Sequence, residues 1–451
     1  MAKKKQIELT IEEKLQNALV PKEEQPYKIP NNWCWVRLDF LLKEICNGTT
    51  IKQNKEGKTA RVTRIESLQN NTIDFNRIGN IVNESLIKDK DWYIEGDIIV
   101  SHINSIEHVG KSAVITRDML PLVHGMNLLR LRLNNICNSQ FFQLYTRTTD
   151  YKKSIVNRVN RAVNQVSINQ KQLCSLEIPI TNLKEQQRIV NRIESLFVKL
   201  DRAKELIENT LAQFEQNKMA ILHKAFTGEL TVKWIKKNNI DLSSWKKYEL
   251  KEVFKVVKDK YNPQIENQIV NYIGLENIET SKGIINKNNS SEVKSIKTKF
   301  KKDDVLYGKL RPYLNKHDVV NFDGICSTDI LVFRFDNINT AKYINYYFNL
   351  PMFIQYAVEN SSGINLPRVS EKTISKYKIS LPIIEEQQEI VNILDKLLAK
   401  YNKIKNLEQQ LEKIELLKKA ILAKAFRGEL GTNNPDEESA ENLLKEILAE
   451  K

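Results

Sequence analysis

Residues 221–230 read Ile-Leu-His-Lys-Ala-Phe-Thr-Gly-Glu-Leu, and residues 421–430 read Ile-Leu-Ala-Lys-Ala-Phe-Arg-Gly-Glu-Leu. A second motif precedes each of these segments, since a Pro-Ile dipeptide is followed by Glu-Gln-Gln at 185–187 and again at 386–388. Two motifs that recur in the same order about 200 residues apart indicate an internal repeat. The chain is therefore predicted to be a tandem duplication.

Weaker matches extend the repeat upstream. The Trp-x-x-Val-x-Leu pattern of residues 33–38 corresponds to Trp-x-x-Tyr-x-Leu at 245–250. Likewise, Asp-Ile-Ile-Val at 97–100 corresponds to Asp-Val-Leu-Tyr at 304–307. Each copy is thus expected to consist of a variable globe followed by a more constant helical segment.

Two long helices are predicted at the ends of the copies. No proline or glycine lies between Pro179 and Gly228 or between Pro382 and Gly428. Each segment carries an apolar seam with a spacing of nearly seven residues, which is typical of helices that pack along their length. Each helix would be about 40 residues and roughly 60 Å long. Because one seam cannot stay in water, we expect the two helices to pack as an antiparallel pair.

The seam residues of the first helix are Ile189, Ile193, Leu196, Leu200, Ala203, Ile207, Leu211 and Phe214, and those of the second are Ile390, Leu394, Leu397, Tyr401, Ile404, Leu407, Leu411, Ile414, Leu417 and Ile421. Gly228 and Gly428 are expected to end the helices as C-cap glycines. Capping alone would explain the glycines of the Ala-Phe-x-Gly-Glu-Leu ends. The recurrence of Phe, Glu and Leu, which a cap does not need, favours a shared docking surface instead.

The two globes, at 25–178 and 241–381, read alike. Both contain short strands rich in β-branched residues, broken by Asn, Gly and Asp turns. Regular alternation of strand and helix is absent, so a mixed α+β fold is favoured over a doubly wound sheet.

The composition favours a polyanionic partner. Among 451 residues, 70 Lys and Arg against 56 Asp and Glu give a net charge of +14. Such an excess indicates binding to nucleic acid or to an anionic membrane surface, although a basic protein without such a partner is the alternative. No apolar run approaches the ~18–20 residues of a membrane span. The five cysteines are scattered and show no Cys-x-x-Cys spacing, which suggests reduced thiols. The N-terminus shows no signal-peptide pattern, so a cytoplasmic location is expected.

Basic and amide side chains gather where strands of the globes are expected to end. Arg reads guanine edges, Asn and Gln read adenine edges, and Lys or Arg also hold phosphates. Any one of these residues could instead be an ordinary solvated loop residue, but as a set they favour DNA contact. The candidate DNA-binding residues are Ser101, His102, Asn104, Lys111, Arg158, Arg161, Asn164, Gln165, Lys309, Arg311, Tyr313, Asn315, Lys316 and Arg368.

The sequence shows no recognisable catalytic motif. It lacks a Gly-x-x-x-x-Gly-Lys-Ser/Thr phosphate loop, an Asn/Asp-Pro-Pro-Tyr/Phe methyltransferase run and a nucleophile context. Its five histidines are scattered and predict no metal site. A non-catalytic DNA-recognition role is therefore favoured. The alternatives are a stand-alone DNA methyltransferase or nuclease, and a coiled-coil scaffold without affinity for DNA.

Together these motifs resemble the specificity (S) subunit of type I restriction-modification systems, over nearly the whole chain. The resemblance is carried by Ile-Pro-Asn-Asn-Trp-Cys-Trp-Val at 29–36, by Val-Asn-Gln-Val-Ser-Ile-Asn-Gln-Lys-Gln-Leu at 163–173, by Gly-Ile-Asn-Leu-Pro-Arg-Val-Ser at 363–370, and by both Glu-Gln-Gln and both Ala-Phe-x-Gly-Glu-Leu motifs. One departure is that the second globe lacks a clear counterpart of residues 29–32.

The resemblance implies two target-recognition domains that read a bipartite DNA site, with the long helices as a spacer in a pseudo-twofold arrangement. The implied segments are an N-terminal helical arm (1–24), recognition domain 1 (25–178), helix 1 (179–230), a linker (231–240), recognition domain 2 (241–381), helix 2 (382–430) and an acidic helical tail (431–451). In this arrangement the terminal helices expected near residues 10–15 and 441–448 would lie near each other.

The resemblance also implies partners and cofactors. Two methyltransferase subunits would dock on the helical regions, and two restriction subunits could join them. S-adenosylmethionine, ATP and Mg²⁺ would belong to these partners, and this chain would bind no cofactor itself. The candidate partner-binding residues are Glu185, Gln186, Gln187, Phe226, Glu229, Glu386, Gln387, Gln388, Phe426 and Glu429.

Overall fold

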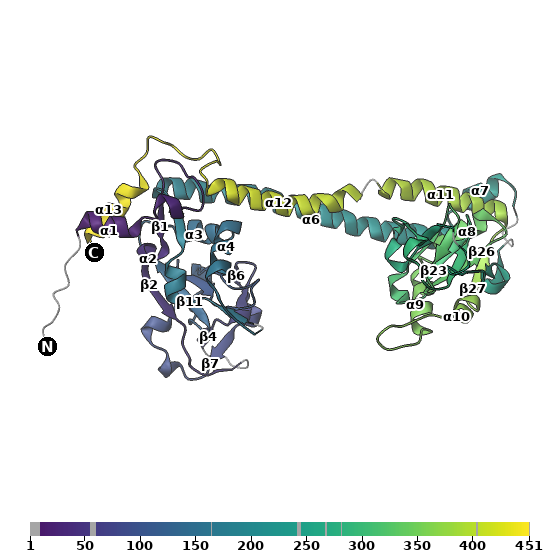
Figure 1. The fold of residues 1–451 in the computed structure, drawn as a ribbon, viewed down its shortest axis with the longest axis horizontal. Coiled ribbons are helices and arrows are strands. Elements are labelled where there is room, and N and C mark those ends of the chain that lie inside the picture. Colours follow the sequence, from purple (N-terminus) through teal and green to yellow (C-terminus); the bar gives the residue numbers. More distant parts are fainter. Residues whose placement is uncertain are drawn as a thin grey trace. The chain divides into compact units, whose positions relative to one another are not determined.

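The computed structural model describes residues 10–54, 60–163, 165–240, 245–266, 268–280, 282–402 and 405–450 (Figure 1). The chain divides into two compact units. Unit 1 comprises Met1–Glu205 and Gln410–Lys451, and unit 2 comprises Leu206–Gln409. Each unit therefore contains one globe together with parts of both long helical segments. Among the described residues, no helix is long and apolar enough to cross a membrane.

The central sheet of each globe has four antiparallel strands in the same spatial order. This order is β10-β8-β11-β2 in unit 1 and β24-β23-β26-β16 in unit 2. The strands are β2 (Leu42–Asn47), β8 (Ile98–Ser101), β10 (Ser112–Val114) and β11 (Leu128–Leu133), and β16 (Lys255–Val256), β23 (Val305–Gly308), β24 (His317–Val319) and β26 (Ile330–Arg334). The match between residues 97–100 and 304–307 in the sequence thus falls on equivalent strands, β8 and β23.

A two-stranded antiparallel sheet joins the entry and exit of each globe. β1 (Cys34–Arg37) pairs with β14 (Glu177–Ile180), and β15 (Lys246–Glu249) pairs with β27 (Lys378–Leu381). The Trp-containing entry segments therefore return beside the strands that lead into the long helices. The expected mixed α+β fold of duplicated globes is confirmed.

Three short helices follow the central sheet in each globe. They are α3 (Ser139–Thr146), α4 (Thr149–Arg158) and α5 (Gln170–Cys174) in unit 1, and α8 (Ile338–Tyr347), α9 (Pro351–Glu359) and α10 (Glu371–Ser375) in unit 2. Corresponding helices begin at comparable caps, because Asn138 and Asn337 accept backbone N–H bonds at the starts of α3 and α8. Side-chain caps of this kind satisfy N–H groups that have no partner within the helix.

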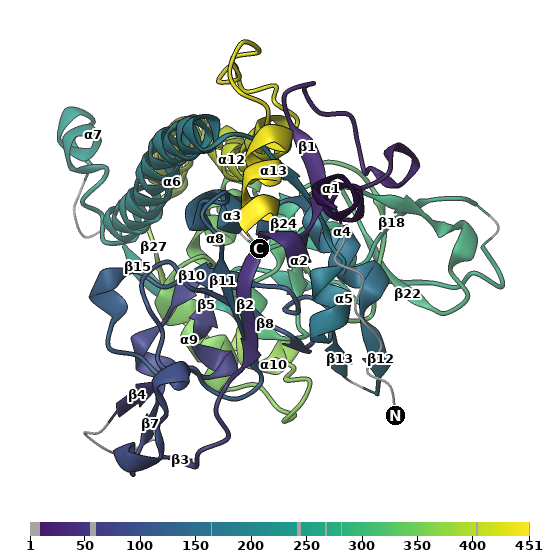
Figure 2. The same ribbon diagram turned by 90° about the vertical axis from the view of Figure 1, so that its left-hand side faces the viewer.

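The globes differ in their additional strands. Unit 1 adds the sheet β3-β7-β4 (Figure 2). Its small core consists of Val62, Ile81 and Val123. Unit 2 adds a five-stranded sheet in the order β17-β22-β25-β18-β21. The additional strands are β3 (Gln53–Asn54), β4 (Ala60–Val62) and β7 (Gly79–Ile81), and β17 (Lys260–Tyr261), β18 (Asn271–Ile273), β21 (Asn288–Asn289), β22 (Lys297–Phe300) and β25 (Gly324–Cys326).

The first long helix, α6 (Leu183–Phe226), is followed by α7 (Val232–Lys237). The second helical segment is described as α11 (Ile384–Asn402) and α12 (Lys405–Ala425); residues 403–404, including the seam residue Ile404, lie outside the described residues, and so does the side chain of Tyr401. Gly228 and Gly428 have φ angles of +81° and +71°, as expected for C-cap glycines.

The long helices run antiparallel where they meet within a unit. In unit 1, Lys204 on α6 pairs with Glu415 on α12 at 3.0 Å, and Asp201 pairs with Lys418. The predicted seam is wrong at one position, because Leu417 is 50% exposed. The neighbouring Lys418 faces α6 instead, and its ammonium lies 5.5 Å from the centre of the Phe197 ring.

The end of each long helix completes the core of the globe encoded by the other copy. In unit 1, Phe426 packs against Phe141 and Tyr145, with ring centroids 5.0 and 5.2 Å apart. In unit 2, Phe226 packs against Tyr343 and Tyr347, with both centroid distances at 5.0 Å. The repeated Ala-Phe motif is therefore a reciprocal packing element.

The terminal helices of unit 1 lie side by side, as predicted. They are α1 (Ile11–Ala18) and α13 (Ala440–Glu450) (Figure 1). Leu15 and Leu444 are buried in the same core. Within the segment 431–451 that was expected to be a helical tail, the acidic run at 436–438 lies before the helix and not in it. Instead, both carboxylate oxygens of Glu437 accept hydrogen bonds from Arg188 on α6, at 2.7 and 2.9 Å.

Candidate nucleic-acid interface

In unit 1, two loops meet beyond the end of β8. The chain leaving β8 forms β9 (Ile103–Asn104), which pairs with β13 (Gln165–Ser167), and β13 pairs with β12 (Asn160–Ala162) (Figure 2). The N–H of Ile168 donates a 2.9 Å hydrogen bond to the carbonyl of His102. We call residues 102–111 and 160–168 loop pair 1.

Unit 2 brings two loops together at the equivalent place. The N–H of Val369 donates a 2.9 Å hydrogen bond to the carbonyl of Lys309, just beyond β23. The N–H of Arg311 donates at 2.7 Å to the carbonyl of Pro367. We call residues 309–316 and 361–369 loop pair 2. Since Ile168 and Val369 make the same bond beyond the equivalent strands β8 and β23, the two loop pairs are structural counterparts.

Loop pair 1 gathers most of the candidate residues of the first globe. Arg161 and Gln165 are exposed on β12 and β13, and Asn104 lies opposite Val166 on β9. Asn164 lies outside the described residues. Arg158 instead forms an ion pair with Glu177, so its guanidinium already has a partner within the globe.

A pocket of about 580 Å³ opens beside loop pair 1. Three candidate residues line it, namely Ser101, Asn104 and Lys111, and Asn104 donates to the buried Ser101 hydroxyl at 3.2 Å. His102 does not line it; burial lowers the pKa of its imidazole. The pocket also contains polar residues that the sequence did not single out: Lys52, Gln53, Arg64, Gln69 and His108. Only the fold brings these residues together, because they come from separate short strands and turns.

Loop pair 2 exposes some of its candidates and buries others. Arg311 and Tyr313 are exposed, as is Arg368, whose guanidinium lies 3.3 Å from a carboxylate oxygen of Asp329. Lys309 is half-buried. Two further candidates hold the loop itself: Lys316 donates to the carbonyl of Leu275 at 2.7 Å, and Asn315 is buried and donates to the carbonyl of Phe348 at 3.0 Å.

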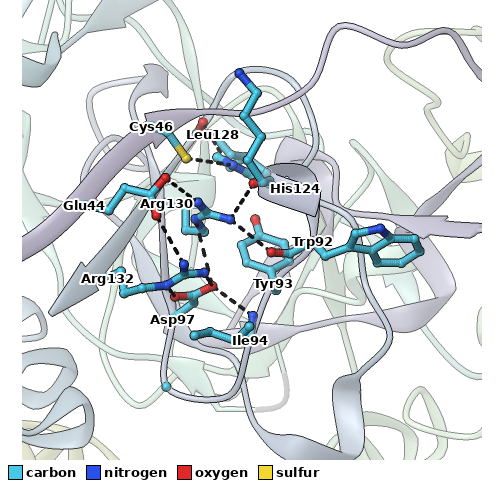
Figure 3. Close-up of polar contacts among 12 residues, drawn as sticks. Glu44, Cys46, Trp92, Tyr93, Ile94, Asp97, His124, Leu128, Arg130 and Arg132 are labelled. Atoms are coloured by element: carbon cyan, nitrogen blue, oxygen red, sulfur yellow. Dashed lines mark hydrogen bonds and ion pairs between the residues drawn. The ribbon is translucent and has the colours of Figure 1, made fainter. Parts of the chain in front are cut away.

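Both central sheets are braced by the same ion pair. Arg132 on β11 donates two hydrogen bonds to Asp97, at 2.7 and 2.8 Å (Figure 3). Arg334 on β26 donates two to Asp304, at 2.8 and 2.7 Å. Bidentate pairs of this kind fix geometry as well as adding stability. Each aspartate lies just before the strand that leads to a loop pair, so the ion pair fixes where that strand begins.

Unit 1 adds a buried cation to this brace (Figure 3). The Arg130 side chain is 1% exposed, donates to Glu44 at 2.8 Å, and holds the carbonyls of Lys90 and Trp92 at 2.7 and 3.0 Å. Arg130 therefore ties the segment before β8 to the central sheet. The equivalent residue in unit 2 is the buried Val332, since Arg132 corresponds to Arg334.

Each globe also buries one neutral histidine close to its interface. Burial lowers the pKa of His124 to about 3, and a ring nitrogen lies 3.0 Å from the carbonyl of Leu128. Burial likewise lowers the pKa of His317 to about 4, although hydrogen bonding to Asn345 opposes the shift. Neither ring carries charge near neutral pH, so neither supplies a cation for DNA.

The candidate partner-binding residues divide into internal and exposed groups. The buried members are Glu185, Gln186, Glu386, Gln387 and Phe426, and Phe226 is half-buried. Gln186 and Gln387 donate to the carbonyls of Thr181 and Pro382, at 2.7 and 2.8 Å. Accessible surface remains on Gln187, Glu229, Gln388 and Glu429.

The described residues include no group of three or more His, Cys, Asp or Glu side chains that could hold a metal ion. The arrangement instead presents two equivalent loop pairs with cationic and amide side chains.

Comparison with known proteins identifies the family to which a chain with this duplicated arrangement belongs. The family model for the type I restriction modification DNA specificity domain matches twice, at residues 31–216 and 243–416. The chain belongs to this family.

Curated specificity subunits are similar over much of the chain. A protein assigned as the MjaX type I restriction enzyme specificity subunit of Methanocaldococcus jannaschii is 30% identical, over 89% of this chain and 95% of that protein. The EcoDI specificity subunit of Escherichia coli is 28% identical, over 62% of this chain and 70% of that protein.

Solved structures share the fold. One of them has a TM-score of 0.64 at 18% identity. Its description is the structural basis underlying complex assembly and conformational transition of the type I R-M system. The HsdS subunit from Thermoanaerobacter tengcongensis has a TM-score of 0.54 at 18% identity. Each alignment covers 90% of this chain and 100% of the other. Members of this family are DNA-recognition subunits, so the interpretation of the chain as non-catalytic agrees with its relatives.

Proposed function

We propose that this chain is the DNA-specificity subunit of a type I restriction-modification complex and that each globe reads one half of a bipartite target. The observation that carries this proposal is the recurrence of a loop pair beyond β8 and β23, tied by the same backbone hydrogen bond in each globe. Equivalent surfaces on two separate globes suit two separate half-sites. The net charge of +14 supports attraction to the DNA backbone.

The exposed members of the loop pairs are the proposed DNA contacts. In unit 1 these are Arg161 and Gln165, with Asn104 and Lys111 at the pocket. In unit 2 they are Arg311, Tyr313 and Arg368, with Lys309 beside them. Arg and amide side chains can read base edges in the grooves of DNA and can also contact its phosphates. Arg158, Asn315 and Lys316 are proposed to support the loops, because their polar groups already bond within the globes.

The remaining chemistry is assigned to partner subunits. We propose that two methyltransferase subunits, which bring S-adenosylmethionine, dock on the helical regions through surfaces that include Gln187, Glu229, Gln388 and Glu429. Restriction subunits using ATP and Mg²⁺ would join that core, in the cytoplasm. This chain itself is proposed to bind no cofactor.

A modification map tests the proposal. The chain is co-expressed with its methyltransferase partner in a host free of DNA methylation, and N6-methyladenine is then located by sequencing. We expect a split motif with a constant gap that disappears when this chain is omitted. Methylation by this chain alone would instead identify an enzyme. No methylation from an assembled pair would favour a scaffold without DNA affinity.

A further inference from the structure

Two apolar side chains project from the loop pairs into solvent. Val163 is 91% exposed and Ile364 is 101% exposed, and these are the highest values among the large apolar residues that the structure describes. Val163 precedes Ile168 by five residues, and Ile364 precedes Val369 by five. Counted back from the equivalent backbone bonds of Ile168 and Val369, the two projecting side chains lie at the same distance in the sequence, in corresponding loops.

A single exposed apolar residue would require no explanation, because such residues are common on protein surfaces. Here the apolar character is shared by both globes, whereas the flanking positions differ. Val163 lies between Arg161 and Gln165, whereas Ile364 lies between Ser362 and Leu366, each two residues away in the sequence. Residues that read different bases are expected to differ between the globes. A feature that both globes keep is therefore suited to a task that does not depend on base sequence.

We propose that Val163 and Ile364 are DNA wedges, each pressing between two stacked base pairs of its half-site and partly unstacking that step. This inference rests on the proposed function. Apolar side chains are used in this way by proteins that kink DNA. Both residues are β-branched, so their side chains are stiff and lose little freedom on insertion. The exposed cations nearby, Arg161 in unit 1 and Arg311 in unit 2, would hold the backbone around the opened step.

The test uses the full chain in complex with its methyltransferase subunits and a duplex that carries the mapped target. 2-Aminopurine, which fluoresces more strongly when unstacked, replaces one purine at a time in each half-site, excluding the adenine that is methylated. We expect increased fluorescence at one step in each half-site. Val163→Ser should abolish the increase in one half-site only, and Ile364→Ser in the other only. Each should weaken binding roughly tenfold, as the loss of one good base contact does.

Matched controls come from the same globes. Val82 is 61% exposed and Ile265 is 76% exposed, and neither belongs to a loop pair. Val82→Ser and Ile265→Ser should leave the fluorescence increase and the affinity unchanged. The wedge proposal is overturned if the wild-type complex protects its target without any increase, or if the increase survives both loop substitutions. Absence of target protection by the wild-type complex would contradict the proposed function instead, so the two failures are distinguishable.

Discussion

The hydroxyl of Thr231 donates a 2.7 Å hydrogen bond to Glu386, and the hydroxyl of Thr432 donates a 2.6 Å hydrogen bond to Glu185. Each threonine follows the Ala-Phe-x-Gly-Glu-Leu end of one helical segment, and each glutamate stands at the start of the other. The two repeated motifs therefore recognise each other across the duplication. This reciprocal bond gives each of the two buried glutamates a hydrogen-bond donor.

Truncating Phe426, one of the two phenylalanines at the helix ends, should destabilise unit 1 and leave unit 2 intact. Phe426→Ala removes the ring that packs on Phe141 and Tyr145, and the expected cost in free energy of unfolding is about 3–5 kcal/mol for unit 1. Hydrogen exchange should show lost protection in unit 1, with unit 2 retained. Leu417→Ala, at the exposed position on α12, is the control and should change little. Equal loss of protection in both units would contradict the assignment of Phe426 to one core.

Substitution of two glycines with similar φ angles should separate the free-energy cost of backbone strain from the cost of a steric clash. Gly428 has a φ of +71°, and an added Cβ would lie 2.2 Å from Cγ of Pro30. Gly431 has a φ of +75°, but an added Cβ would meet nothing within 4 Å. Gly431→Ala should cost about 1 kcal/mol, and Gly428→Ala about 1–3 kcal/mol more. Chemical denaturation measures both, and equal costs would show that Pro30 moves aside freely.

Arg130→Met should destabilise the first globe even though the second carries an apolar residue at this position. Methionine would leave the carbonyls of Lys90 and Trp92 without their donor, which costs about 1–3 kcal/mol. The measurement is the unfolding midpoint in urea. Arg77→Met is the control, because the Arg77 side chain is 56% exposed. An unchanged midpoint for Arg130→Met would mean that water replaces the guanidinium.

Stability should fall as the pH drops below about 6.5. The folded-state pKa values of His124 and His317 are depressed, to about 3 and about 4, so the unfolded chain binds these protons first. Their contribution is fully present above the unfolded pKa and decreases by about 1.4 kcal/mol per pH unit and per histidine on the way down to the folded values. His124→Gln should flatten the pH dependence of unit 1 between pH 6.5 and 4. An unaltered pH profile would refute the neutral buried state of His124.

Two neighbouring arginines should show opposite defects. Arg161→Gln removes an exposed cation of loop pair 1, so binding to one half-site should weaken by about 1–3 kcal/mol without loss of thermal stability. Arg158→Gln leaves the buried Glu177 without its cationic partner and should lower the melting temperature. Fluorescence anisotropy with target DNA and a thermal melt distinguish these effects. Loss of affinity from Arg158→Gln at unchanged stability would reverse the two roles.

The sequence was sufficient to predict the duplication and the long helices with their glycine caps, because these depend on local periodicity and repeated motifs. The closeness of the terminal helices followed instead from the pseudo-twofold arrangement that the family resemblance implied. It did not predict that Glu185 is buried, since its partner Thr432 lies far away in the chain. Asn315 was expected at the surface as a polar loop residue, but its φ of +43° turns it inward toward Phe348. The pocket residues Arg64 and Gln69 were missed because no local pattern shows which short segments meet.

The division of the chain also sets an order of events during synthesis. Unit 2 is one continuous segment, Leu206–Gln409, and all of its core residues leave the ribosome in succession. The core of unit 1 is incomplete until Phe426 and Leu444 have been made, and both are made only after the whole of unit 2. At typical elongation rates this delay is roughly 10–40 s. The first globe to be translated is thus expected to be the last to finish folding, with its unfilled core open to chaperones in the meantime.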